Sequence, residues 1–322
     1  MIMATSTKQR LKELRLSDIV PNDENPRIIF RQEEMETLMV SIAKHGVQVP
    51  IAVFQDGKQY VLIDGERRWR ASKKLNLRQI PALVQKRPTQ LENLLLMSNI
   101  HALREQWDYF TIATNLSKIL SLYEAEYGEV PNEITLSETT GLTRGQIRRC
   151  NLLLGLPDRF KDMLMEELEL PKAQQKLSED LFIEMERSLK TVTRRLPEFS
   201  ENLEDIRDTL VGKFRDGIIG AVTDFRQLSK IATAIDNLGI QHRTAKAALN
   251  KVFNPNSRVG IREVYERTVE FGYDEKRASQ QVTFLNEYIS ELLEQEIQDE
   301  LDEEFIEQLE KLYKRLEELL GD

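Results

Sequence analysis

The fold of this chain is decided by residues 62–71, which read LIDGERRWRA. The apolar run at residues 60–63 predicts a strand that stops before Gly65, where a helix begins. A helix that starts directly after a glycine turn leaves its first backbone N–H groups unpaired, and these groups attract anions. Arg67 and Arg68 add planar charge that suits phosphate. The stretch therefore predicts a phosphate-binding turn, although an amphipathic helix with a solvated basic face fits the same spacing equally well.

Length and composition indicate a helix-rich globular chain. Its 322 residues suffice for two or three domains with cores of their own. No apolar run approaches the roughly 20 residues that span a bilayer, so no membrane partner is predicted, and the N-terminal residues lack the apolar segment of a signal peptide. The single cysteine, Cys150, fits a reducing cytoplasm. The histidines His45, His101 and His242 are scattered, so no protein-based metal site is predicted.

The negative charge is concentrated at one end of the chain. Residues 291–322 hold 13 acidic and 3 basic residues, a net charge of -10. Because the whole chain carries -9, the remaining residues sum to +1. The acidity therefore does not exclude a basic, nucleic-acid-binding surface upstream.

The first part of the chain alternates short strands and helices, which predicts a small α+β domain. Residues 14–20 are expected to form a short strand and a turn. The other expected strands are residues 49–54, 59–63 and 80–84, and the expected helices are residues 33–45 and 65–76. The pair Asp56-Gly57 between two of these strands is a strong signal for a hairpin turn.

From residue 90 onward the pattern is helical almost throughout, with a long helix expected at residues 108–127. Further helices are expected to about residue 250. Residues 254–257 are expected to form a linker, and residues 271–273 (FGY) to break the helical pattern.

A helix-turn-helix is predicted at residues 134–154. Gly141 supplies the tight turn, and Thr143 is the expected N-cap of the second helix. The residues predicted to contact DNA from this helix are Thr143, Arg144, Gln146, Arg148 and Arg149. Arg and Gln pair bidentately with guanine and adenine in the major groove. A generic helical hairpin with a solvated basic face is the alternative, and DNA binding is favoured because glycine, cap and apolar spacing agree. Cys150 is expected to be a core residue.

The last helix carries apolar residues at heptad spacing, namely Phe305, Leu309, Leu312, Leu316 and Leu319. This stripe predicts either a dimer contact or an acidic arm that folds over the basic surface. A terminal helix packed on its own domain is slightly favoured over both, because two heptads are few.

Three boxes in the right order resemble the ParB/Spo0J (ParB/RepB) partition family, whose N-terminal domain shares a fold with sulfiredoxin. Residues 25–27 (NPR) with Glu34, Leu38, Ser41 and Ile42 resemble the first box. Residues 48–51 (QVPI) and 65–71 (GERRWRA) resemble the second, and residues 143–157 match the family's helix-turn-helix without a gap. The likeness covers roughly residues 12–172, about half of the chain.

The resemblance implies a nucleotide-gated DNA-binding protein. In the family the second box grips the phosphates of cytidine triphosphate (CTP), and the helix-turn-helix reads a palindromic site. Binding of both closes a dimer into a clamp on DNA, and slow hydrolysis reopens it. The residues implied in nucleotide binding are Gly65, Glu66, Arg67, Arg68 and Asn99, with Glu66 supporting the turn. CTP and Mg2+ are the implied cofactors. Double-stranded DNA, a second copy of the chain and a ParA-type ATPase are the implied partners, on nucleoid or plasmid DNA in the cytoplasm.

One box departs from the family pattern. The family has Glu-Asn-apolar-Gln-Arg where residues 98–102 read SNIHA, so only the amide of Asn99 is kept. The missing acid predicts that nucleotide is bound but poorly hydrolysed, so at most a weak CTPase is expected and no catalytic residue is assigned. The family's arginine-bearing peptide that stimulates ParA is poorly matched, since only Lys8, Arg10, Lys12 and Arg15 resemble it.

The predicted domains follow from these patterns. They are residues 1–90, ParB/sulfiredoxin-like and nucleotide-binding; 91–175, the helix-turn-helix domain; 176–290, a helical C-terminal region; and 291–322, an acidic amphipathic terminal helix.

Three functions are weighed. The first is a partition factor gated by CTP. The second is a transcription or replication regulator that no longer hydrolyses nucleotide, which the altered box favours. The third is a ParB-like nuclease, which ranks lowest because Asp64 and Glu66 are flanked by arginines and form no carboxylate cluster for a metal.

Overall fold

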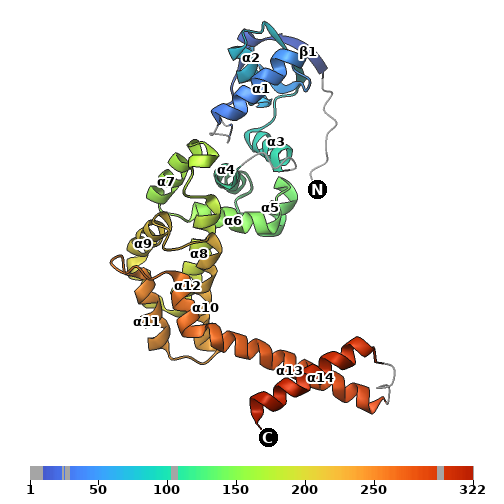
Figure 1. Cartoon of the computed structure of the whole chain (residues 1–322). Coiled ribbons are helices and arrows are strands. Elements are labelled where there is room, and N and C mark those ends of the chain that lie inside the picture. The colour runs from blue at the N-terminus through green and yellow to red at the C-terminus, as the bar shows by residue number, and fades with distance from the viewer. Residues whose placement is uncertain (1–9, 24, 26–29, 103–107, 296–300, 322) are drawn as a thin grey trace.

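The computed structural model describes residues 10–23, 25, 30–102, 108–295 and 301–321, without the side chains of residues 99–102. An α+β domain lies at one end, a stack of helices follows, and a long helix projects from the stack and is crossed by the last helix (Figure 1). The predicted α+β fold with a helical remainder is confirmed.

The N-terminal domain is built on a five-stranded mixed sheet in the order β1-β5-β3-β4-β2. The strands are β1 (Arg10–Arg15), β2 (Ile19–Val20), β3 (Ile51–Asp56), β4 (Gln59–Asp64) and β5 (Gln79–Gln85). β5 runs antiparallel to β1 and parallel to β3, while β2 runs parallel to β4. β3 and β4 form an antiparallel hairpin in which Asp56 pairs with Gln59, so the hairpin predicted from Asp56-Gly57 is confirmed.

The short strand and turn predicted at residues 14–20 are present, although the strand begins earlier, at Arg10. β1 ends at Arg15, a 3-10 turn (Leu16–Asp18) follows, and β2 then pairs with a different strand. The buried side chain of Leu16 explains the turn, because it brings an apolar residue into the core while the chain crosses to the other edge of the sheet.

Two helices complete this domain and pack against each other, α1 (Gln32–His45) and α2 (Glu66–Lys74). Ile42 of α1 and Ala71 of α2 belong to one small apolar cluster. Trp69, also on α2, packs with the buried side chains of the strands. α2 is therefore held by apolar contacts with α1 and with the strands of the sheet.

The helices that follow share one apolar core, which runs from Leu91 to Val269 and continues across residue 175. They are α3 (Gln90–Ala102), α4 (Tyr109–Tyr127), α5 (Glu133–Thr140), α6 (Arg144–Leu154), α7 (Asp158–Glu169), α8 (Glu179–Arg195), α9 (Leu203–Arg215), α10 (Phe225–Asn237), α11 (His242–Phe253) and α12 (Ile261–Tyr265). Short 3-10 segments lie between some of them, at Lys172–Gln174, Pro197–Asn202 and Val222–Asp224.

The break predicted at residues 271–273 is wrong. α12 continues through a π-helical turn (Glu266–Glu270) directly into α13 (Phe271–Glu294). A Cβ on Gly272 would lie 3.0 Å from the Leu238 side chain, so this glycine permits close packing against the end of α10. The Tyr273 hydroxyl donates to the Lys230 carbonyl at 2.8 Å and holds the helix there.

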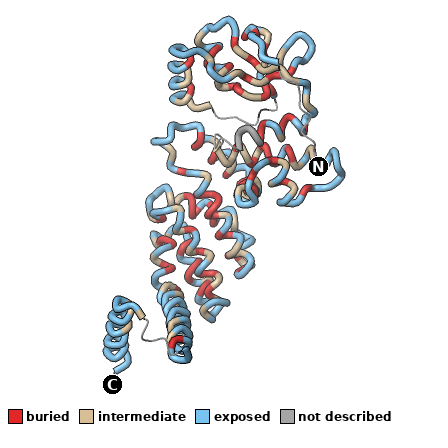
Figure 2. The backbone as a smooth tube through the Cα atoms, turned by 90° about the vertical axis from the view of Figure 1, so that its right-hand side faces the viewer, coloured by how far each residue is buried: buried red, intermediate tan, exposed pale blue. Residues whose placement is uncertain are grey.

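The last helix, α14 (Glu303–Leu320), lies apart from the helical core and from α6 (Figure 1). Most of α13 is exposed and no residue of α14 is buried in the described part of the chain (Figure 2), so the favoured packing on its own domain is not what the structure shows. α14 meets α13 where Tyr288 and Phe305 pack edge to face, 6.1 Å between ring centroids. Its exposed apolar side chains are Ile306, Leu312, Tyr313, Leu316, Leu319 and Leu320.

Two ionisable groups near the N-terminus of α4 are strongly affected by burial. Burial raises the pKa of the Cys150 thiol to about 12, as expected for a core residue. Glu179 of α8 accepts the Phe110 N–H at 2.6 Å, beside Asp108, the N-cap of α4. Burial, and then the charge of Asp108, raise the pKa of Glu179 to about 7. The helical core therefore favours the neutral form of this carboxyl.

We expect Glu179→Gln to flatten the pH dependence of stability. The pKa of Glu179 rises on folding from 4.5 to about 7, so the free energy of unfolding falls as the pH rises through this window and stays low above it. A glutamine keeps an acceptor for the Phe110 N–H and carries no charge. Urea unfolding should show that the free energy of unfolding of the wild type is about 1–3 kcal/mol lower at pH 8 than at pH 5. This difference should be absent in the variant.

The control is Glu169→Gln, which makes the same change at an exposed site on α7. If Glu179→Gln and the wild type lost the same stability between the two pH values, this origin of the pH dependence would be wrong.

Candidate nucleotide pocket and nucleic-acid interface

A single residue, Gly65, joins the end of β4 to the start of α2. Its φ of +96° is left-handed, and a Cβ there would lie 2.6 Å from Cγ2 of Ile51 and 2.7 Å from Nη2 of Arg68. Any other residue would therefore push the strand and helix apart. The first helical hydrogen bond runs from the Trp69 N–H to the Gly65 carbonyl at 3.0 Å, so the N–H groups before it have no acceptor within the helix.

A pocket of ≈ 320 Å³ opens beside this turn, a size at the lower end of ligand sites. It lies between α1, the segment after α1, the end of β4 and the start of α2. Residues of both resembling boxes line it, among them Asn25, Ser41, Gln48, Gly65, Arg67 and Arg68. The fold thus brings residues of both boxes, from Asn25 to Arg68, to one pocket.

The two arginines of the pocket wall are held by carboxylates of the same chain. Nη1 of Arg67 lies 3.3 Å from Oε2 of Glu34, and its Nη2 donates to the Glu34 carbonyl at 3.3 Å. Nη2 of Arg68 donates to Oδ2 of Asp64 at 2.9 Å. Since both guanidiniums are already ion-paired, an incoming phosphate has to compete with Glu34 and Asp64.

Glu66, the first residue of α2, also lines the pocket. Its side chain is buried, and Oε1 accepts from Nε and Nη2 of Arg70 at 2.7 and 2.5 Å. Oε2 accepts from Nδ2 of Asn25, in the first box. The guanidinium of Arg70 lies 4.0 Å from the ring centroid of Phe30. Glu66 therefore ties the loop of the first box to α2.

The box that departs from the family pattern, residues 98–102, lies on α3. Ser98, which stands where the family has an acid, is buried, and its hydroxyl accepts from Nδ2 of Asn115 on α4 at 2.5 Å. The side chain of Asn99, predicted to contact nucleotide, lies outside the described residues. Within residues that are described, no group of three or more His, Cys, Asp and Glu side chains could hold a metal ion.

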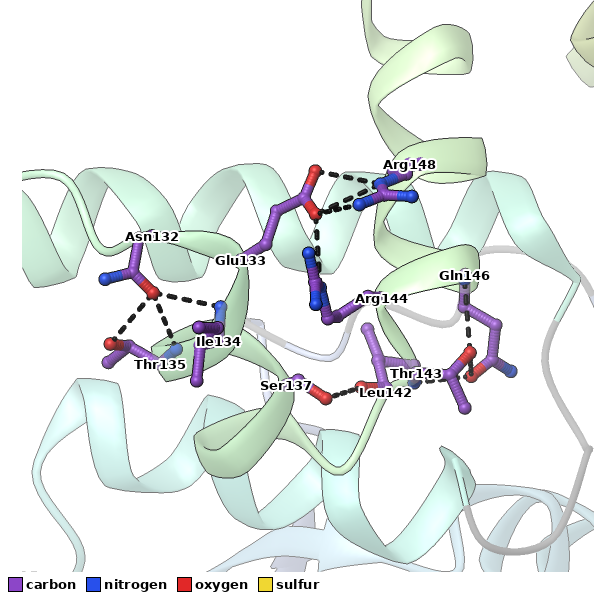
Figure 3. A network of polar contacts seen from close by, with 10 residues as sticks. All are labelled: Asn132, Glu133, Ile134, Thr135, Ser137, Leu142, Thr143, Arg144, Gln146 and Arg148. Carbon is purple, nitrogen blue, oxygen red and sulfur yellow. Dashed lines mark hydrogen bonds and ion pairs between the residues drawn. The ribbon is translucent and has the colours of Figure 1, made fainter.

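The predicted helix-turn-helix corresponds to α5 and α6, joined through Gly141 at φ +73°. Thr143 and Gln146 form a capping box in which the Thr143 N–H donates to Oε1 of Gln146 at 2.8 Å (Figure 3). The Ser137 hydroxyl donates to the Leu142 carbonyl at 2.6 Å and closes the turn. The side-chain oxygen of Gln146 is therefore used within the motif, whereas its side-chain nitrogen has no partner among the contacts of the described residues.

Two of the predicted DNA contacts, Arg144 and Arg148, are exposed arginines, with 56% and 58% of their side chains accessible. Both face one carboxylate, Glu133 at the start of α5 (Figure 3). Nε and Nη2 of Arg148 each lie 3.0 Å from Oε2 of Glu133, and Nε of Arg144 lies 3.6 Å from the same oxygen. The hydrogen bond from Arg148 lowers the pKa of Glu133 and raises the pKa of Arg148.

Arg149 has a different position from its neighbours. Its guanidinium pairs with Asp180 of α8 and lies 4.6 Å from the ring centroid of Tyr109, so it links α6 to α8 and α4.

Sequence reasoning missed Glu133, and the one signal for it is an acid directly after the N-cap Asn132. None of the described helices has both the length and the apolar character needed to cross a bilayer.

Comparison with known proteins identifies the N-terminal part. Residues 3–100 match the family described as the ParB N-terminal domain. The nucleoid occlusion protein of Bacillus velezensis is 32% identical over 165 residues, which cover 50% of this chain and 56% of that protein. The probable chromosome-partitioning protein ParB of Helicobacter pylori is 30% identical over 159 residues, covering 49% and 52%. The chain therefore matches about half the length of these curated relatives.

Solved structures of ParB proteins are also similar to this chain. The C-terminally truncated chromosome-partitioning protein ParB from Caulobacter crescentus complexed with CTP-γ-S is 25% identical, with a TM-score of 0.29, and the match covers 54% of this chain and 92% of that one. The same protein complexed to the centromeric parS site is 18% identical, with a TM-score of 0.38 and coverage of 74% and 99%. Because these overall superpositions are loose, the assignment rests on the sequence matches. Residues 3–100 therefore match a ParB N-terminal domain, and the chain is similar to ParB-family proteins over about half of its length.

Proposed function

We propose that this chain is a sequence-specific DNA-binding protein of plasmid or chromosome partition, gated by CTP bound beside Gly65. The observation that carries the proposal is the meeting of residues of both boxes at one pocket, whose turn admits only glycine. Phosphate would approach the first N–H groups of α2, where the backbone itself offers donors and a partial positive charge. Arg67 and Arg68 would exchange their carboxylates for phosphate oxygens.

CTP is the nucleotide that the family resemblance implies. Mg2+ is proposed only together with the triphosphate, because the described residues offer no carboxylate cluster that could hold it. No step is assigned to the metal, and hydrolysis is proposed to be weak at most, since Ser98 stands where the family has an acid and is used between α3 and α4.

DNA is proposed to be read by the N-terminal half of α6. In a helix-turn-helix the second helix lies in the major groove, and its first residues reach the base edges. Arg144 and Arg148 are exposed on this part of α6. Arg149 is proposed to contribute through packing instead of base contact, because it is held between Asp180 and Tyr109.

A dimer is proposed to form through the hairpin of α13 and α14. Leu312, Leu316 and Leu319 of the apolar stripe of α14 are exposed at heptad spacing, which suits a second copy of the same helix. A twofold dimer would place two copies of α6 on a palindromic site. A ParA-type ATPase partner and a location on nucleoid or plasmid DNA follow from the family resemblance and are proposed with it.

One alternative has an observation in its favour. Ser98 stands where the family has an acid, and its hydroxyl accepts a hydrogen bond from Asn115. This contact fits a transcription or replication regulator that no longer hydrolyses nucleotide. The nuclease alternative has no comparable support, because Asp64 and Glu66 are ion-paired with Arg68 and Arg70.

We expect the purified chain to bind CTP, and Arg68→Ala to weaken this binding about 10-fold or more, because charge-assisted hydrogen bonds to phosphate are lost. Isothermal titration calorimetry, with and without DNA, measures the affinity, and thermal melting checks that the variant is folded. The matched control is Arg78→Ala, an exposed arginine between α2 and β5 that is not part of the pocket lining. If CTP bound under neither condition, or bound the Arg68 variant as well as the wild type, nucleotide gating at this pocket would be refuted.

Arg144→Ala and Arg148→Ala should each weaken the free energy of binding to the preferred DNA site by about 1–3 kcal/mol. At least one of them should also relax the sequence preference at one base position. Selection from random duplex DNA followed by titration measures both effects. Lys74→Ala serves as the control, since an exposed lysine on α2 should leave the selected sequence unchanged. An unchanged preferred site in both arginine variants is the result that contradicts base reading by α6.

The double variant Leu316→Glu, Leu319→Glu should turn the dimer into a monomer without lowering the melting temperature of the helical core. Charge on the exposed stripe opposes association, whereas these side chains are not buried in the described chain. Analytical ultracentrifugation measures the mass, with Glu310→Gln on the same helix as the control. A variant that stays dimeric, or a wild type that is monomeric, excludes this interface.

A further inference from the structure

One carboxylate, that of Glu133, lies between the two exposed arginines of α6. We infer that Glu133 is a specificity-determining residue, which keeps Arg144 and Arg148 from binding DNA phosphates indiscriminately. The inference rests on the proposed reading of DNA by α6 and adds a residue that acts against non-specific DNA.

The position of Glu133 is fixed by its helix. Asn132 caps α5, and its Oδ1 accepts the N–H groups of Ile134 and Thr135 at 2.9 and 3.0 Å (Figure 3). Glu133 is therefore the first residue of α5, where the helix dipole favours a negative charge. The arginines lower the pKa of Glu133 further, so the carboxylate stays ionised at neutral pH.

The contacts of Glu133 leave part of each guanidinium available. Arg148 uses Nε and Nη2, so its Nη1 has no partner among the contacts of the described residues. Arg144 approaches the same carboxylate through Nε alone, at 3.6 Å. Donors of both arginines can thus reach base edges while the net charge of the group is reduced from +2 to +1.

This arrangement bears directly on non-specific binding. Binding of DNA without regard to sequence comes almost entirely from contacts between cations and phosphates. In helix-turn-helix complexes the first helix of the motif crosses the DNA backbone, which places the start of α5 near phosphates. A carboxylate there repels the backbone and competes with phosphate for both arginines, a penalty that only matching base contacts offset.

The test is Glu133→Gln, which keeps the size of the side chain and removes its charge. The probes are a short fluorescent duplex of random sequence and the duplex that the wild type selects, titrated by anisotropy between about 50 and 200 mM salt. The variant should bind the random duplex about 10-fold more tightly, with a salt slope steeper by about 1 to 2, the share of one or two phosphate contacts. Affinity for the selected duplex should change less than about 3-fold. The specificity ratio, which is the affinity for the selected duplex divided by that for the random duplex, therefore falls.

Two further variants separate this role from general charge or folding effects. Glu138→Gln makes the same change at an exposed position near the other end of α5, where the described residues include no ion pair with Glu138. It should leave the ratio unchanged. In an Arg148→Ala background, Glu133→Gln should gain clearly less affinity for random DNA, because one of the two arginines that it releases is absent.

The outcomes are distinguishable. If Glu133→Gln bound random DNA no more tightly than the wild type, or weakened both duplexes equally, the inference would be overturned while the proposed function stood. If the wild type itself bound neither duplex, the proposed function would fail, and the inference with it.

Discussion

In both candidate sites, the arginines are held by carboxylates of the same chain. Glu34 and Asp64 hold the pair at the start of α2, and Glu133 holds the exposed pair on α6. Binding of a phosphate is therefore an exchange of one anion for another, and the gain is the difference between two charge-assisted contacts. This exchange favours ligands that offer several oxygens in a fixed geometry, such as a triphosphate or a DNA backbone with matching bases, over a single free anion.

Sequence reasoning succeeded where structure is set by neighbouring residues. The hairpin at Asp56-Gly57, the turn at Gly65 and the turn at Gly141 all depend on local backbone geometry that few residues other than glycine adopt easily. The cap of α6 by Thr143 is equally local, since donor and acceptor lie within one helical turn. These features position both candidate sites, which is why the pocket and the second helix of the helix-turn-helix could be located from the sequence.

Sequence reasoning failed where the outcome depends on residues far apart in the chain. Gly272 was expected to break a helix, but it allows α13 to pack closely against Leu238. Arg149 resembles its neighbours in sequence, yet Tyr109 and Asp180, from two other helices, hold it. Glu133 lies 15 residues from Arg148 in the sequence, and only the angle between α5 and α6 brings the two side chains together. The spacing of apolar and charged residues along the sequence gives no signal for such pairs.

Whether a nucleotide beside Gly65 changes how α6 holds DNA is tested most directly by one measurement. Release of the wild-type chain from its selected duplex is followed after dilution into competitor DNA, with and without CTP. The proposed gating predicts that CTP changes the release rate from the selected duplex and leaves release from a scrambled duplex unaltered. Identical release with and without CTP would contradict it, because the two sites would then act independently.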